Sequence, residues 1–186
     1  MNTLKINICV LFLFGIVYLM NAQQDSQYTQ YMYNTSSINP AYSGTREALS
    51  FNALYRAQWV GLEGAPKTSQ FSIHSPIGKQ KKWALGLNFF NDKIGPTSES
   101  NITIDGAYTI NLSEYTKLAF GLKLGANFLN LDANKLNPET ATTVDSEINS
   151  FNRISPTLGA GVYMYQSNWY VGISFNNVIE SNHFLD

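Results

Sequence analysis

From Leu49 onward, apolar and polar side chains alternate along the chain with a period of two. Successive side chains of a β-strand point to opposite faces of a sheet, so each alternating segment predicts a strand with one apolar and one polar face. In the first segment, 49–59, Phe51 and Tyr55 share the apolar face, whereas Asn52 and Arg56 share the polar face. Because no amphipathic helix separates the repeats, the pattern predicts an antiparallel meander of about seven strands. The further segments are 69–75, 82–90, 101–110, 117–129, 157–165 and 169–176.

The connections between these segments differ in length. Those at 111–115 and 166–168 are short, whereas those at 91–100 and 132–155 are long. If the first strand starts on the periplasmic side, the short turns fall there and the long loops fall outside, as in outer-membrane barrels. The basic connection 78–82 is of middling length, and we interpret it as a solvated turn or as a contact for lipid phosphates or an acidic partner.

Composition favours a membrane location for this sheet. Charged residues make up 13% of the chain, against about 25% in ordinary soluble domains. The polar faces carry mainly Gly, Asn, Ser and Thr, whereas the polar face of a soluble sandwich should carry Lys and Glu. Trp83 and Trp169 would lie near the inner membrane interface and Trp59 near the outer one. We therefore predict an all-β transmembrane barrel; the alternative is a secreted soluble β-sandwich or lipocalin-like binding module.

The N-terminus has the features of an export signal. Lys5 precedes an apolar core, 8–20, which ends near the small residue Ala22 and is shorter than the roughly 20 residues that cross a bilayer as a helix. We predict a removed signal peptide at 1–22; an uncleaved anchor and a lipoprotein signal are the alternatives. The only cysteine, Cys9, lies within the apolar core, which argues against the lipoprotein signal and leaves the mature chain without disulfides.

The sequence contains no pattern typical of catalysis or cofactor binding. The net charge of −1 offers no basic field for nucleic acid. His74 has no accompanying nucleophile and acid in a recognisable arrangement, no metal-ligand spacing occurs, and 61–66 lacks the Lys-Ser/Thr of a phosphate loop. We expect no catalytic residue, metal, cofactor or small-molecule substrate, and an outer-membrane enzyme is the least favoured hypothesis. Arg56, His74, Asp105 and Lys123 are expected to face the lumen, as a structural ion-pair network rather than a transport site.

Two segments are candidates for contact with a partner. The loop that carries Trp59, Gly61, Gly64 and Pro66 is either a tight extracellular loop or a partner-binding loop. The other candidate lies within the polar segment 23–48, where 27–44 is uncharged and rich in amides and tyrosines. We expect 27–44 to pack in the lumen or across the periplasmic mouth, where small residues would leave it room; the alternative is a disordered periplasmic leader. Its proposed contact residues are Tyr31, Tyr33, Asn39, Pro40 and Tyr42, and the small lumen residues are Gly86, Gly121, Gly125, Gly159 and Gly161.

Four stretches carry a resemblance to a known family: QYTQYMYN, INPAYSG, YRAQWVGLEGAPKTSQFSIHSPI (55–77) and YVGISFNNV (170–178). These stretches occur in the order found in the PorP/SprF family of type IX secretion outer-membrane proteins. The chain resembles that family over nearly its whole mature length. The resemblance implies a noncatalytic role in protein secretion and gliding motility, with type IX secretion components and a secreted client such as an adhesin as partners.

The resemblance and the strand pattern together predict location and extent. We expect a bacterial outer-membrane protein, in contact with outer-membrane lipid, with a periplasmic N-terminus and extracellular long loops. Family members are usually longer, and closed single-chain barrels have an even number of strands. We therefore expect 49–186 to be the N-terminal part of a longer barrel, or to close by pairing with another chain.

Overall fold

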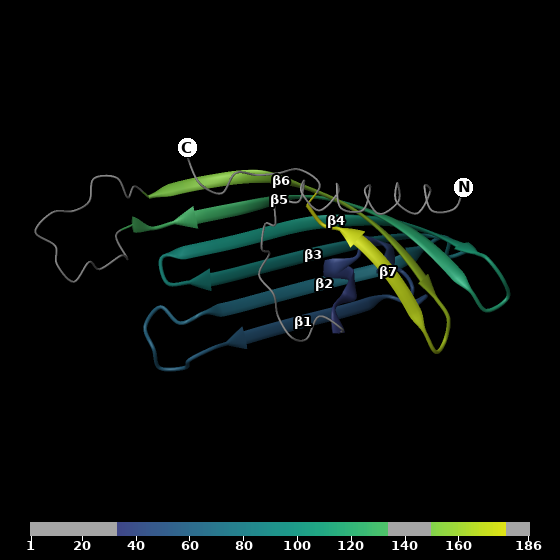
Figure 1. The fold of residues 1–186 in the computed structure, drawn as a ribbon, viewed down its shortest axis with the longest axis horizontal. Helices are drawn as coiled ribbons and strands as arrows, with labels where there is room; N and C mark the ends of the chain where they lie inside the picture. The colour runs from purple at the N-terminus through teal and green to yellow at the C-terminus, as the bar shows by residue number, and fades with distance from the viewer. Residues whose placement is uncertain (1–32, 134–149, 178–186) are drawn as a thin grey trace, which may run out of the picture.

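The computed structural model describes residues 33–133 and 150–177. Seven antiparallel strands form one sheet in chain order, and each strand pairs with its sequence neighbour (Figure 1). The meander predicted from the alternation of side chains is therefore confirmed. The strands are β1 (Ser50–Ala57), β2 (Lys67–Ile77), β3 (Trp83–Ile94), β4 (Thr97–Asn111), β5 (Lys117–Leu131), β6 (Phe151–Tyr165) and β7 (Tyr170–Phe175).

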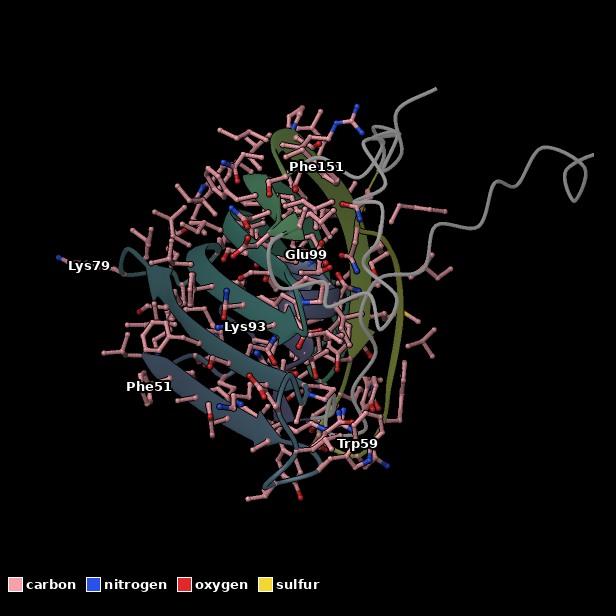
Figure 2. All side chains as sticks on the ribbon, turned by 90° about the vertical axis from the view of Figure 1, so that its left-hand side faces the viewer. Phe51, Trp59, Lys79, Lys93, Glu99 and Phe151 are labelled. Carbon is pink, nitrogen blue, oxygen red and sulfur yellow. The ribbon has the colours of Figure 1, made fainter. Side chains whose placement is uncertain are left out.

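The sheet curls so that its apolar side chains lie on the convex face. Figure 2, which looks along the strands, shows the curl and places Phe51 on its outside. Leu85, Ile104 and Leu122 on the same face are also exposed, and no other described element covers them. In a soluble sandwich this face would be packed under a second sheet. The arrangement is instead that of a barrel wall, apolar outside and polar inside.

Between residues 34 and 49, two short helices lie on the concave face of the sheet. These are α2 (Thr35–Ile38) and the 3₁₀ helix η2 (Pro40–Tyr42). The Asn39 side chain accepts a hydrogen bond from the backbone N–H of Ala41, and Pro40 supplies the fixed φ that suits the first helical position. Within residues 33–133 and 150–177, no helix is long and apolar enough to span a membrane.

The prediction of a long loop at 91–100 is wrong. Strand β3 continues to Ile94 and β4 starts at Thr97, so only Gly95 and Pro96 connect them. Polar cross-strand pairs extend the ladder here; for example, the Asn91 amide donates to Ser100 Oγ at 2.8 Å. Backbone pairing needs no apolar face, and alternation of apolar and polar residues therefore underestimates such strand ends.

The sixth strand is also longer than its alternation predicts, because it begins at Phe151 and not at 157. The long connection expected at 132–155 is correspondingly shorter at its C-terminal end. Its residues 134–149 lie outside the described part of the chain, as do the predicted signal peptide 1–22 and Tyr31.

Candidate functional site

The concave face of the sheet holds residues 34–44, here called the docked segment (Figure 1, purple). Asn39, Pro40 and Ala41 of this segment are buried. The Asn39 amide reaches β6 and donates to the backbone carbonyl of Val162 at 3.1 Å. The segment therefore satisfies its own polar groups partly on the wall, as a buried polar chain must.

Two strand glycines make room for the docked segment. A Cβ at Gly121 on β5 would overlap the backbone of Ala41, and a Cβ at Gly161 on β6 would overlap the Asn39 side chain. Gly121 and Gly161 are cross-strand partners, so the missing side chains form one shallow seat on the wall. Any larger residue at either position would have to push the segment away.

The other small residues on this face differ in what they contact. A Cβ at Gly86 would come within 2.7 Å of Ser43 Oγ, so Gly86 also lies under the docked segment. A Cβ at Gly125 would instead meet Thr103 of the neighbouring strand β4, and one at Gly159 would meet the backbone of Phe175 at 2.9 Å. The nearest atoms to these two positions belong to the wall itself, so these glycines allow close approach within the wall.

A polar network joins the docked segment to the middle of the wall. Asp105 is completely buried and accepts hydrogen bonds from Asn88 Nδ2 at 2.7 Å and from Ser43 Oγ at 3.5 Å. Lys123, its cross-strand partner on β5, donates to the backbone carbonyl of Ser37. Charges buried in this way need polar partners. Here both charged groups find a partner in the docked segment, so the network holds the segment and the wall together.

His74 on β2 accepts the backbone N–H at the end of the docked segment. The distance from Gly44 N to His74 Nδ1 is 3.1 Å. An imidazole nitrogen accepts only when it carries no proton, so this contact assigns the proton of the neutral ring to Nε2. Tyr42 packs edge-on against the same ring, with 5.7 Å between the ring centroids. His74 therefore positions the chain where it turns toward β1.

An aromatic cluster covers the other side of Tyr42. Its ring packs edge-on against Tyr163 of β6, with centroids 5.5 Å apart. Tyr163 in turn stacks on Tyr170 of β7 at a centroid separation of 5.5 Å. Such contacts contribute beyond simple area burial, and they connect the docked segment to the last two strands of the sheet.

The exit from the docked segment is fixed at the end of the sheet that carries the β2–β3, β4–β5 and β6–β7 turns. Glu47 forms an ion pair with Lys117 at the start of β5, and its backbone carbonyl accepts from Lys81 Nζ at 2.9 Å. The hydrogen bond and positive charge of Lys117 lower the pKa of the Glu47 carboxyl. These charged contacts join the chain to the β2–β3 and β4–β5 turns.

The residues predicted to be contacts of the docked segment differ in how deeply they are buried. Asn39 and Pro40 are buried against the wall, and Tyr42 is half-buried between His74 and Tyr163. Tyr33 is exposed, although its backbone carbonyl accepts from the Asn52 amide of β1 at 3.2 Å.

Of the four polar residues expected in the lumen, His74, Asp105 and Lys123 are buried beside the docked segment. Arg56 is half-buried on the same face of β1. Its guanidinium donates to the Gln58 amide oxygen at 2.9 Å in the favoured amide orientation. The structure thus brings three of the four together around one segment.

The predicted partner loop lies apart from the docked segment, between β1 and β2. Trp59 is exposed, with a left-handed φ of 49°. Gly61 and Gly64 also have positive φ, which glycine adopts without steric cost. Pro66 is buried, and the carbonyl of Gly64 accepts from the N–H of Gly95 at 2.9 Å. The loop therefore packs beside the β3–β4 turn, at the opposite end of β2 from the charged contacts of Glu47.

Small polar residues also hold the segment, and the sequence pattern does not single them out. Ser72 Oγ donates to Asn34 Oδ1 at 2.7 Å, and Ser36 Oγ donates to Asn88 Oδ1 at 3.3 Å. The available signal is positional: Ser72 and Asn88 occupy the polar face of their strands, opposite an uncharged hydroxyl-rich segment. Among the described residues, no three His, Cys, Asp or Glu side chains form a group that could hold a metal.

The comparison with known protein families adds one finding. A family model described as type IX secretion system membrane protein PorP/SprF matches residues 20–186. The matched range contains the docked segment and all seven strands. No curated protein and no solved structure matches the chain.

Proposed function

The chain belongs to the PorP/SprF family of type IX secretion system membrane proteins, and on this premise we propose that it is a noncatalytic outer-membrane component of type IX secretion and gliding motility. In this role it assists the export or surface attachment of a partner protein such as an adhesin. The observation that carries the proposal is the family match, because it spans the docked segment together with the sheet.

The height of the convex apolar band supports an outer-membrane location. On β5 the band runs from Leu118 to Phe128 and ends before Asn130. At about 3.4 Å per residue this stretch is about 34 Å long. A strand tilt of about 40° reduces its height to about 26 Å, close to the roughly 25 Å apolar band of outer-membrane barrels.

The site where the chain leaves the concave face to begin β1 supports a periplasmic N-terminus. The contacts of Glu47 with Lys81 and Lys117 lie at the end of the sheet where the short turns 78–82, 112–116 and 166–169 gather. The opposite end carries the two-residue β3–β4 turn, but also the loop 58–66 and the long connection between β5 and β6, and long loops are typical of the extracellular end of such barrels. In the proposed topology the loop 58–66 and the connection between β5 and β6 are extracellular.

We assign the docked segment the role of a plug that couples the wall to a partner. It is polar and uncharged between 34 and 44, and it fills the seat left by Gly121 and Gly161. Hydrogen bonds from the wall stabilise it, whereas insertion of the sheet depends on the apolar convex face. The plug can therefore be altered without removing the sheet from the membrane.

The test of the proposed function is a chromosomal in-frame deletion, complemented in trans with the wild-type gene. Proteins released to the medium and proteins held on the cell surface are then compared by quantitative mass spectrometry. We expect a defined set of proteins to accumulate in the periplasm of the deletion strain and to return to the surface on complementation. Unchanged export, with the periplasm also unchanged, would contradict a secretion role.

Location is tested separately by washing membranes with alkaline carbonate. We expect the wild-type chain to remain in the outer-membrane fraction and to enter solution only with detergent. Release by carbonate alone would overturn the membrane placement while leaving the secretion assay interpretable.

A further inference from the structure

Beyond the apolar band, the convex face becomes polar on five neighbouring strands, β2 to β6. On β3, for example, exposed Leu85, Leu87 and Phe89 are followed on the same face by Asn91 and Lys93. The change from apolar to polar occurs within the ladder and not in a loop, since all of these residues are paired. We call these convex polar residues the collar: Lys67, Ser69, Asn91, Lys93, Ser98, Ser100, Asn130 and Asn152.

Two lysines stand side by side in the collar. Lys67 on β2 and Lys93 on β3 are direct cross-strand partners, and both are exposed. Within residues 33–133 and 150–177, neither ammonium group has a hydrogen bond or an ion pair; the one salt bridge there joins Lys117 to Glu47. Side chains directly opposite each other on one face lie about 5 Å apart at Cβ, and like charges so placed destabilise the sheet.

The neighbouring carboxylates are on the other face of the sheet. Asp92 points to the concave side, where it accepts from Thr68 Oγ1 at 2.7 Å. Glu99 accepts there from the Asn127 amide at 2.7 Å. Figure 2 labels Lys93 and Glu99, which lie on either side of the β3–β4 turn. Glu63, in the nearby loop, is exposed and forms no ion pair with either lysine. Lys67 and Lys93 thus face outward, while the neighbouring carboxylates of Asp92 and Glu99 face inward.

An anion shared by Lys67 and Lys93 would relieve their repulsion. A lysine ammonium is a compact point charge that binds phosphate well. The two lysines lie directly beyond the apolar band, at the level where lipid headgroups meet a barrel wall. Their position therefore favours the phosphate of a lipid headgroup. Ser69 and Asn91, in the adjacent row, add groups that can hydrogen-bond a headgroup.

We propose that Lys67 and Lys93 form a binding site for the phosphate of an anionic membrane lipid, in the leaflet where β2 and β3 leave the apolar band. The inference rests on the membrane placement given above and adds a specific lipid contact to it. Its occupant is a lipid headgroup, held by the two ammonium groups while the acyl chains lie along the convex face beside Phe71 and Phe89.

The test uses the full chain in a nonionic detergent, titrated with phosphatidylglycerol and, separately, with zwitterionic phosphatidylcholine. Native mass spectrometry counts the bound lipid. We expect the wild type to prefer phosphatidylglycerol, and K67Q/K93Q to lose affinity for it by about five-fold per lysine. The charge-retaining variant K67R/K93R should bind as the wild type does. Equal binding by K67Q/K93Q and the wild type would overturn the site.

Two controls distinguish a lipid site at Lys67 and Lys93 from general charge attraction and from free-anion binding. K79Q/K82Q removes two exposed lysines at the opposite end of β2 and β3, and an equal loss of lipid there would show a general charge effect and overturn the assignment. Displacement of the lipid by an equal concentration of inorganic phosphate would show a free-anion site and also overturn it.

The membrane placement is checked with the same variants. If K67Q/K93Q resists carbonate extraction as the wild type does, its loss of lipid binding reflects the site and not a failure to assemble. Release of the wild type itself in that wash would instead count against the membrane placement, and with it against a lipid occupant of the lysine pair.

Discussion

The side chain of Asn39 lies where a Cβ of Gly161 would be, so one strand glycine determines whether the docked segment can reach β6. From this position the Asn39 amide donates to the carbonyl of Val162 on the same strand. The contact joins residues more than a hundred positions apart in the chain, and it requires both the amide and the absence of a side chain. It therefore gives a direct way to loosen the segment without altering the apolar face.

Gly161→Val should displace the docked segment. The new side chain overlaps Asn39, and overpacking of this kind costs about 1–3 kcal/mol. Limited proteolysis of the purified protein should then cut within 34–44 faster than in the wild type. The matched control is Gly106→Val, since a Cβ at Gly106 meets nothing within 4 Å. Equal cleavage rates in the two variants would show that Gly161 is not part of the seat.

Leu122→Arg should block assembly into the membrane. Leu122 is an exposed convex residue in the middle of the apolar band, where an arginine costs about 2–4 kcal/mol at the bilayer midplane. We expect the variant to be lost from the carbonate-resistant outer-membrane fraction. Asn130→Arg, on the same face and strand but in the collar, should assemble normally. If both variants assemble equally well, the convex face does not contact lipid.

The Glu47–Lys117 pair should make the attachment of the chain exit depend on pH. The hydrogen bond and charge of Lys117 lower the pKa of Glu47 below its ordinary value of 4.5. The carboxylate therefore contributes stability above pH 4.5, and this contribution is lost as the pH falls through the lowered pKa. Both side chains are partly exposed, so the effect is small, about 0–1 kcal/mol.

The measurement for this pair is thermal unfolding of the wild type and of E47Q from about pH 3 to 7, a range that brackets the titration. We expect the wild type to be slightly more stable at neutral pH and the difference to vanish at the acid end. Raised salt should reduce the difference at neutral pH, because exposed ion pairs are screened. A difference that persists unchanged at the acid end would show that charge is not its origin.

The strands could be predicted because their signal is local. Apolar side chains such as Phe51 and Leu85 occur at every second position of their strands. A period of two predicts both the strand and which of its residues share the apolar face. The polar strand ends carry less information. At 91–94 and 97–100 the residues on both faces are mostly polar, so periodicity could not show that Asn91 pairs with Ser100 and extends the ladder.

For the docked segment, the sequence could predict the type of contact but not the residues that form each contact. Its amides, hydroxyls and tyrosines, and the small residues of the strands, indicate a polar segment in a narrow space. The particular contacts of Ser43 with Asp105 and of Glu47 with Lys117 depend on the curl of the sheet. No local pattern encodes them, because each partner lies in a different strand far along the chain.

Deletion of residues 34–42 should separate insertion of the sheet from secretion. The segment contributes hydrogen bonds to the concave wall, for instance through Asn39, and none of the convex apolar surface. In the deletion variant we therefore expect normal recovery of the sheet in the carbonate-resistant outer-membrane fraction. If the docked segment acts as the proposed plug, export of the client should fail in this variant.

A variant with 34–42 replaced by a glycine-serine stretch of the same length controls for chain length, and it should fail in export as the deletion does. The double substitution N39A/P40A removes the cap and the fixed turn of η2 and the hydrogen bond from Asn39 to Val162, but it leaves the rest of the segment in place and should reduce export less. Wild-type export by the deletion variant would rule out a coupling role for the segment. Loss of the sheet from the membrane in all three variants would mean that the docked segment is needed for folding, because Ser37 and Ser43 are then no longer held against the buried Lys123 and Asp105.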